Sequence, residues 1–450
     1  MNKKVEETKK FGLFTVIMMI VGIVIGSGIF FKSSSILIAT NGNILLGIAV
    51  FCIAAISIVF GSLTIAKLAA RTEETGGVIS YATNEINSYA GCVIGWYHFF
   101  LLYSTTVGVV GWVAAIYIES VFGLNLSVDQ KLLVSFLVIV LFFCLNIFSS
   151  KLASLFQTSA TIIKLIPLIL IAILGFIFGD FENFITAPQT AQATNQLGWI
   201  SAIMPVAFAY EGWIVATSLT HKIENPKKNL PIALILSPLF ILVVYVCYFV
   251  GISLYVGPQK MMSMGDAHML FAATRLFGKI GGRAVVVAVL ISVLGTLNGN
   301  IMGLIQLPYS LSLRGMFPSS NKFSKVSDKF ETPIYSGLLG FFVASVWLVV
   351  NYIDQKYKIL GNSDICEIVI VVNYLLYVML YIKVIKLKKN NEIKGFFGGY
   401  VAPVMAIVGS GVMLYGGLQN PKFIYMFVVC LSVIVSALLF WNKANKRVKA

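Results

Sequence analysis

The sequence predicts an all-α polytopic membrane protein with twelve transmembrane helices. Of its 450 residues, 58% are apolar and only 11% are charged, and the mean hydropathy is +0.90. Such a chain exposes too little polar surface for a water-soluble globule. Its apolar runs reach the roughly 20 residues that a helix needs to cross about 30 Å of hydrocarbon. Because they lack the polar alternation of outer-membrane strands, helices remain as the way to satisfy backbone polar groups in lipid.

Twelve apolar runs follow one another along the chain, and each is long enough to cross a bilayer. The expected spans are residues 11–40, 44–68, 92–118, 130–149, 155–178, 198–220, 231–256, 283–310, 333–353, 361–384, 397–418 and 423–442. The basic segment 1–10 precedes a span without a signal-peptidase site, so a cytoplasmic tail is expected. The cytoplasmic segments then carry 23 Lys and Arg residues and the outer segments 7, which predicts cytoplasmic termini. These basic loops account for the net charge of +15, so no nucleic-acid partner is expected.

Two of the twelve runs are interrupted by small and polar residues. Gly26-Ser27-Gly28 divides the first run, and AYEGW at 209–213 divides the sixth. The interruptions lie about 183 residues apart, close to the offset between spans two and seven. Broken helices at matching positions in two five-helix halves are typical of inverted-repeat membrane transporters. The expected organisation is a core at 11–390 with repeats at about 11–180 and 198–390, helices eleven and twelve at 395–442, and a cytoplasmic tail at 443–450.

The glycines of the first interruption let the backbone leave helical geometry at little cost. Where the helix restarts, the N–H groups of Ser27, Gly28 and Ile29 lack intrahelical partners and carry the positive end of a helix dipole, which favours a carboxylate. Carbonyls at the broken ends favour an ammonium group, and they belong to Val24, Ile25, Phe208, Ala209 and Glu211. These groups together predict a site for a zwitterion, the backbone of an α-amino acid. The alternative for Gly22 and Gly26 is a helix-packing face of the GxxxG type.

Six motifs, in order along the chain, resemble the amino acid-polyamine-organocation superfamily, and within it the L-amino acid transporter branch. They are GIVIGSGIF (22–30), RTEETGGVISY (71–81), QTSATIIKLIPL (157–168), FAYEGW (208–213), ENPKKNLPIAL (224–234) and ISVLGTLNGNIMGL (291–304). The branch includes bacterial serine/threonine and alanine-serine-cysteine exchangers. The resemblance implies a LeuT-like fold of two inverted five-helix repeats with discontinuous helices one and six, working by alternating access.

The resemblance also implies roles for the residues of both interruptions. The substrate carboxylate would contact Gly26, Ser27 and Gly28. The amine would contact carbonyls of Val24, Ile25, Phe208 and Glu211, with Ala209 and Gly212 completing the second interruption. The Phe208 ring would close over the substrate as a gate.

Lys164 lies in the middle of span five, where an unpaired ammonium group costs several kcal/mol. The resemblance places it near the first interruption, in the region where sodium-coupled relatives keep a cation, with Tyr245 as its partner. A fixed positive charge there would repel sodium, so sodium-independent exchange is expected. Glu211 leaves a second mechanism open, because a buried carboxylate can carry a proton and support proton-coupled symport. Its side chain could equally just line a wet cavity.

No motif for a hydrolase, an ATP-driven pump or a metal site is present, so no enzyme activity, cofactor or metal is expected. The six cysteines lie in or at the edges of apolar runs. Eukaryotic members of the branch use a cysteine between spans three and four to bond a heavy subunit, and segment 119–131 has none. We therefore expect a stand-alone transporter of bacterial type in the cell membrane.

Substrate choice is predicted from what the spans lack. No intramembrane acidic pair is evident for a cationic substrate, which favours small neutral L-amino acids such as alanine, serine, threonine and cysteine. Asn298 and Asn300 in span eight are polar candidates for the pocket, or they bond neighbouring helices. The centrally placed ionisable groups are Lys164 and Glu211. A channel should show rings of charge, so a channel or receptor is the less favoured alternative.

Overall fold

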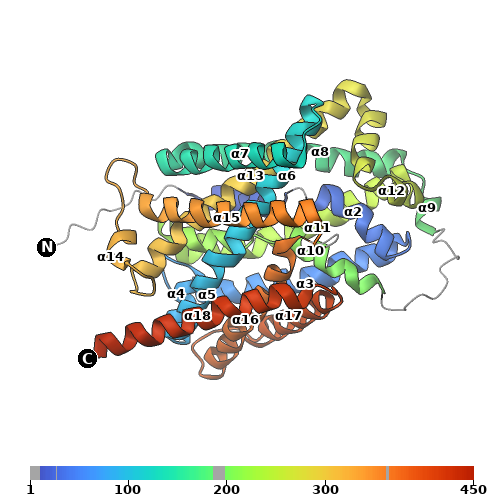
Figure 1. Ribbon diagram of the computed structural model, residues 1–450. Coiled ribbons are helices and arrows are strands. Elements are labelled where there is room, and N and C mark those ends of the chain that lie inside the picture. Colours follow the sequence, from blue (N-terminus) through green and yellow to red (C-terminus); the bar gives the residue numbers. More distant parts are fainter. Residues whose placement is uncertain (1–10, 27, 186–197, 361–363, 450) are drawn as a thin grey trace.

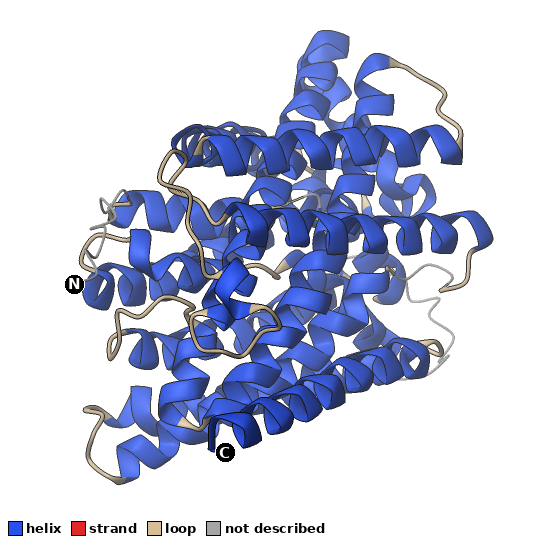
Figure 2. Ribbon diagram, turned by 60° about the vertical axis from the view of Figure 1, so that its left-hand side comes forward, coloured by secondary structure: helices blue, strands red, loops and turns tan. Residues whose placement is uncertain are grey.

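The computed structural model describes residues 11–26, 28–185, 198–360 and 364–449, and long helices run side by side through it (Figure 1). Ten described helices are long and apolar enough to cross a membrane, and they correspond to expected spans two to five and seven to twelve. The other two expected spans are the interrupted ones, so the structure is consistent with twelve. Within the described residues the β-structure is one isolated bridge, between Phe11 and Ile223. The all-α fold class is confirmed (Figure 2).

The first expected repeat contains the divided span one and four long spans. Its elements are α1 (Leu13–Val24), α2 (Gly28–Ala39), α3 (Ile44–Ala69), α4 (Val78–Glu85), α5 (Ser88–Tyr97), the π-helical η1 (His98–Tyr103), α6 (Ser104–Phe122), α7 (Val128–Phe148), α8 (Ser150–Phe178) and α9 (Glu182–Ile185). Span three therefore begins earlier than expected, at Ser88, and runs through the π-helical turn. A capping box of Ser127 and Gln130 begins α7.

The second expected repeat contains the divided span six, and two further spans follow it. Its elements are η2 (Gly198–Ala202), α10 (Ile203–Ala209), η3 (Val215–Lys222), α11 (Pro226–Val256), α12 (Pro258–Met264), η4 (Gly265–Ala267), α13 (His268–Ser312), α14 (Ser320–Phe323), α15 (Ile334–Tyr357) and α16 (Ile365–Lys389). The last spans are η5 (Phe397–Val401) with α17 (Ala402–Leu418), and α18 (Phe423–Lys449). Gly278, with φ 71°, turns the chain before span eight.

The connections lie at two opposite ends of the bundle (Figure 1). One end carries α14 and the C-terminal end of α18, and we call it the inner end because its loops are those expected in the cytoplasm. The other end carries α9 and α12, and we call it the outer end. Segments 314–329 and 257–279, which the charge count assigns to different sides, are thus separated by the length of the bundle.

The inner end is closed by the loop between spans two and three. Arg314, just after α13, donates from Nη2 to the Thr75 carbonyl at 2.7 Å and to Ser80 Oγ at 2.6 Å. Its guanidinium also pairs with Glu74 at 3.2 Å. Gly77 has φ 50°, and a Cβ atom there would lie 2.3 Å from the Thr217 carbonyl oxygen. The loop can therefore lie against η3 only because this residue is a glycine.

The first residues before α1 contribute to the same closure. Phe11 is buried, its N–H donates to the Lys222 carbonyl at 3.0 Å, and its carbonyl accepts from the Glu224 N–H at 2.9 Å. These bonds tie the start of span one to the end of span six. The inner ends of both interrupted spans are therefore held together in this structure.

Arg314→Ala should loosen the inner end, because three acceptors in the loop between spans two and three lose a charged donor. We expect amide hydrogen exchange in residues 72–81 to speed up by about tenfold or more, since a hydrogen bond to a charged group contributes about 1.5–3 kcal/mol. Lys325→Ala, on the nearby exposed loop, is the control. Equal exchange in the two variants would show that the guanidinium does not hold the loop.

Candidate binding site at the two helix breaks

The interruption of span one is a true break in the helix. Helix α1 ends at Val24, and Ile25 leaves helical geometry with ψ 86°. The Gly26 N–H turns back to the Val24 carbonyl at 2.8 Å, and α2 restarts at Gly28. Ser27, the remaining predicted donor, lies outside the described residues. The predicted discontinuity of helix one is therefore present.

Glycine is required at residue 28 by the approach of another backbone. A Cβ atom on Gly28 would lie 2.9 Å from the Cα atom of Ala209, at the end of α10. A Cβ atom on Gly26 would meet the Thr296 side chain at 2.8 Å, and a side chain yields more readily than a backbone atom. Gly28 thus marks the point where the two interrupted spans touch.

The carbonyls that α1 leaves open at its end accept hydrogen bonds from three other spans. Lys164 Nζ on α8 donates to Gly22 and Ile25, Ser292 Oγ to Ile25 at 3.1 Å, Thr296 Oγ1 to Ile23 at 3.0 Å, and Tyr245 Oη on α11 to Val24 at 3.1 Å. Lys164 is fully buried. Its ammonium group therefore caps a helix C-terminus, where the negative end of the dipole favours a cation.

Tyr245 connects the two interruptions to each other. Its hydroxyl lies 2.8 Å from the Ala209 carbonyl oxygen as well as 3.1 Å from that of Val24. The sequence resemblance made this tyrosine the partner of Lys164. In the structure both side chains contact the end of α1, but they contact different carbonyls, and Tyr245 lies between α1 and α10.

The interruption of span six faces the first one. After α10 the Glu211 N–H returns to the Phe208 carbonyl at 3.1 Å, and the chain turns at Gly212 with φ 106°. A Cβ atom on Gly212 would lie 2.5 Å from a methyl carbon of Ile23. The helix then resumes as the 3₁₀-helix η3 and not as an α-helix. The second predicted discontinuity is present as well.

A small space of about 20 Å³ lies between the two breaks. Its lining residues come from the breaks and from spans three and eight: Ile23, Val24, Gly26, Gly28, Thr106, Val110, Phe208, Ala209, Glu211, Thr296 and Asn300. Two predicted site residues, Ile25 and Gly212, lie beside this space. The Ile25 carbonyl accepts a hydrogen bond from Lys164, and Gly212 packs against Ile23. Glu211 is buried, and its Oε2 has no hydrogen-bond partner among the described residues.

The sequence did not predict some of the residues that line this space. Thr106, Val110 and Thr296 lie on continuous helices whose sequence gives no sign of which face meets the breaks. Asn300 was a candidate and does line the space. Asn298 instead bonds neighbouring helices, through the Gln157 side chain at 2.9 Å, the Ala153 carbonyl and Asn146.

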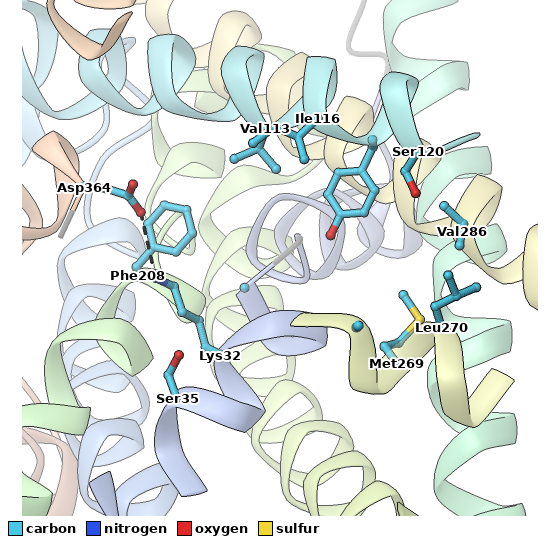
Figure 3. A pocket seen from close by; sticks show the side chains of 13 residues that line it. Lys32, Ser35, Val113, Ile116, Ser120, Phe208, Met269, Leu270, Val286 and Asp364 are labelled. Atoms are coloured by element: carbon cyan, nitrogen blue, oxygen red, sulfur yellow. Dashed lines mark ion pairs between the residues drawn. The ribbon is translucent and has the colours of Figure 1, made fainter. Parts of the chain in front are cut away.

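A second, larger cavity of about 530 Å³, which we call the vestibule, lies toward the outer end, and Figure 3 shows the side chains around it. Gly28 and Phe208 line both this vestibule and the small space. The partly buried Phe208 ring therefore stands at the boundary between them. Lys32 and Asp364 face each other near the ring, with Lys32 Nζ 3.8 Å from Asp364 Oδ2.

The sequence identified Lys164 and Glu211 as the centrally placed ionisable groups, and the structure adds a buried carboxylate at the start of span ten. Glu367, in the first turn of α16, is only 2% exposed. Its partner is Lys32, at 3.2 Å. The pairing was not evident from the sequence because 335 residues separate the two.

Comparisons with known proteins agree on one family. The family described as amino acid permease matches residues 11–450. The serine/threonine exchanger SteT of Bacillus subtilis is 28% identical over 417 residues, which is 90% of each chain. The Asc-type amino acid transporter 1 of Mus musculus is 28% identical over 331 residues, covering 71% of this chain and 61% of the relative. The human large neutral amino acids transporter small subunit 2 is 26% identical, covering 77% and 66%.

A solved structure supports the architecture. The crystal structure of MhsT in complex with L-phenylalanine superposes with a TM-score of 0.64 at 13% identity, covering 92% of this chain and all of that one. At such low identity the likeness concerns the fold alone. The predicted LeuT-like arrangement with discontinuous helices one and six is thereby confirmed.

Gly28→Ala should strain the contact between the breaks, because the added Cβ meets backbone that cannot rotate away. We expect the free energy of unfolding in detergent to fall by about 1–3 kcal/mol, as for other overpacked sites. Gly411→Ala is the matched control, since a Cβ there meets nothing within 4 Å and α17 gains a better helix former. Equal melting temperatures for the two variants would contradict the close contact.

Proposed function

The chain belongs to the amino acid permease family of the amino acid-polyamine-organocation superfamily, and we propose that it exchanges small neutral L-amino acids across a cell membrane without sodium. It is a multi-pass membrane transporter of amino acids, not an enzyme. The observation that carries the proposal is the pair of facing breaks at Gly28 and Ala209, in a family of this transport class. The name of the relative SteT supports exchange of small hydroxyl-bearing amino acids.

We place the substrate backbone between the two breaks. The N-terminus of α2, with unpaired N–H groups from Gly28 onward and the preceding Gly26 and Ser27, takes the carboxylate. The amine goes to acceptors on the wall of the space, the carbonyls of Val24 and Phe208 and the region of Glu211. The Ile25 carbonyl accepts from Lys164 and Ser292, and the Val24 carbonyl accepts from the Gly26 N–H and lies 3.1 Å from the Tyr245 hydroxyl. Both are therefore weaker acceptors than their positions in the sequence suggested. Ala209 and Gly212 shape the site by close packing.

Sodium independence is supported by what surrounds Lys164. Carbonyl and hydroxyl oxygens are the ligands that a hard monovalent cation would use, and those of Gly22, Ile25 and Ser292 converge at this point. The ammonium group of Lys164 already satisfies the two carbonyls. A sodium ion would have to displace it and would be repelled by its charge.

Neutral substrates are supported by the wall of the space between the breaks. Thr106, Val110, Thr296 and Asn300 border it beside the backbone groups, and none of these four side chains carries a charge. Glu211 also lines the space, and we place the substrate amine in its region. The uncharged remainder of the wall favours a neutral side chain.

A proton-coupled symporter is the second candidate, and one observation favours it. Glu211 is buried on the wall of the space with Oε2 free of partners among the described residues. A carboxyl group in that position could take up and release a proton. The relative SteT is named an exchanger, which favours the first mechanism. Exchange therefore remains the first proposal.

The remaining proposals concern the setting of the transporter. The charge count supports cytoplasmic termini and the relative in Bacillus subtilis supports a bacterial type. We also propose that it works without a disulfide-linked heavy subunit. The six cysteines lie within helices, and none lies in segment 119–131 between spans three and four.

Labelled L-serine should enter proteoliposomes only when they contain unlabelled amino acid, because exchange returns a loaded site in each cycle. We expect the same uptake in choline buffer as in sodium buffer, and no response to an imposed pH gradient. The measurement is filtration of liposomes with purified protein against empty ones. Uptake into unloaded liposomes that follows a proton gradient would instead support symport through Glu211.

A further inference from the structure

Lys32 lies on the same face of α2 as Gly28, the residue at which the two broken helices touch. It follows Gly28 by four residues, which is about one helical turn, so both residues lie on the same side of the half-helix. Both line the vestibule. Figure 3 shows the Lys32 side chain reaching toward the Phe208 ring and Asp364. The charge is thus next to the boundary between the vestibule and the small space.

Two carboxylates at the start of α16 hold the ammonium group. Lys32 Nζ lies 3.2 Å from Glu367 Oε1 and 3.8 Å from Asp364 Oδ2. Asp364 is the residue before α16 and Glu367 is in its first turn, where the helix dipole stabilises negative charge. The Lys32 side chain is 21% exposed, whereas that of Glu367 is only 2% exposed.

The same ammonium group reaches the aromatic ring at the boundary. Lys32 Nζ lies 5.9 Å from the centroid of the Phe208 ring, within the range of a cation–π interaction. Phe208 belongs to the last turn of α10. One side chain therefore connects three elements that border the break: its own helix α2, the end of α10 and the start of α16.

The energetics of this contact favour two discrete positions. If α2 moved away from α16, Glu367 would be left as a buried carboxylate without its partner, which is expensive in an apolar setting. At an intermediate distance between α2 and α16, Glu367 would lose its attraction to Lys32 and would still be buried. The contact is therefore either made or fully broken, as expected of an interlock between packed helices.

We propose that Lys32 is the positioning residue of the outer gate, which by its pairing with Glu367 holds α2 against α16 and keeps the Phe208 ring over the break. Substrate passes from the vestibule to the break when this contact opens, and the contact re-forms behind it. The inference rests on the proposed transport function and assigns to Lys32 and Glu367 a part in it. Neither residue contacts the small space between the breaks.

The test uses purified protein in proteoliposomes and the exchange of L-serine. The variants are Lys32→Met, Glu367→Gln, the two together, and the charge-reversed pair Lys32→Glu/Glu367→Lys. Lys131→Met is the matched control, because Lys131 pairs with Glu119 at 2.8 Å with 22% of its side chain exposed and does not line the vestibule. Maximal exchange rate and KM are measured per amount of monodisperse protein.

We expect each single variant to lower the maximal rate by about tenfold or more, because it removes the pairing that holds α2 against α16, and Lys32→Met in addition leaves Glu367 as a buried carboxylate without this partner. KM should change by less than about threefold, since the substrate contacts are intact. The double variant should be no slower than the slower single variant, because non-additivity is the sign of direct coupling, and it should stay slower than the unmodified protein because the contact that holds the gate is gone. The charge-reversed pair should exchange as well, and Lys131→Met should lie within about twofold of the unmodified protein.

Three results would overturn the inference: Lys32→Met behaving like Lys131→Met, a double variant as slow as the product of the singles, or a raised KM with an unchanged maximal rate. If a single variant does not fold, the charge-reversed pair decides, and its failure to exchange counts against the gate. If the unmodified protein itself does not exchange serine, the proposed function fails. The two failures are therefore distinguishable.

Discussion

The structure depends on the need to satisfy the open carbonyls at the end of α1 inside a membrane protein. A helix that stops within the hydrocarbon layer has no water to complete its last turn, so its acceptors must find donors in the protein. Lys164, Ser292, Thr296 and Tyr245 supply them from three different spans. The interruption is tolerated because α8, α11 and α13 all converge on it.

This arrangement makes the two sides of the break unequal. The acceptors at the end of α1 are held by neighbouring spans, whereas the first N–H groups of α2 have no partners within the helix, and we propose that they bind the ligand. Gly28 and Ala209 bring the second broken helix against this point, and the Tyr245 hydroxyl lies within hydrogen-bond distance of a carbonyl from each broken helix. In this arrangement α1 is fixed by neighbouring spans, and α2 is the half-helix that can respond to the ligand. Such a division suits a transporter that binds its substrate at the midplane of the membrane and moves its outer half-helix.

Much of the fold could be predicted from the sequence because apolar length and glycine breaks are local signals. The spans, both interruptions and the near position of Lys164 to α1 follow from such signals and from the family motifs. Pairings between distant segments are different, since no residue near Lys32 in the sequence indicates that it pairs with Glu367. Helix periodicity alone also could not predict that Asn298 points away from the space and that Asn300 lines it. Ile25 shows the same limit, because its carbonyl could be assigned only once Lys164 was placed.

The central claim is that the breaks hold both charged ends of an amino acid, and analogues that lack one end test it most directly. Binding of labelled L-serine to the purified protein in sodium-free buffer would be competed with L-serinamide, which has no carboxylate, and N-acetyl-L-serine, which has no ammonium group. The account predicts that unlabelled L-serine competes and that both analogues bind at least about tenfold more weakly, or ~1.4 kcal/mol. Competition by either analogue as strong as that by L-serine would contradict it.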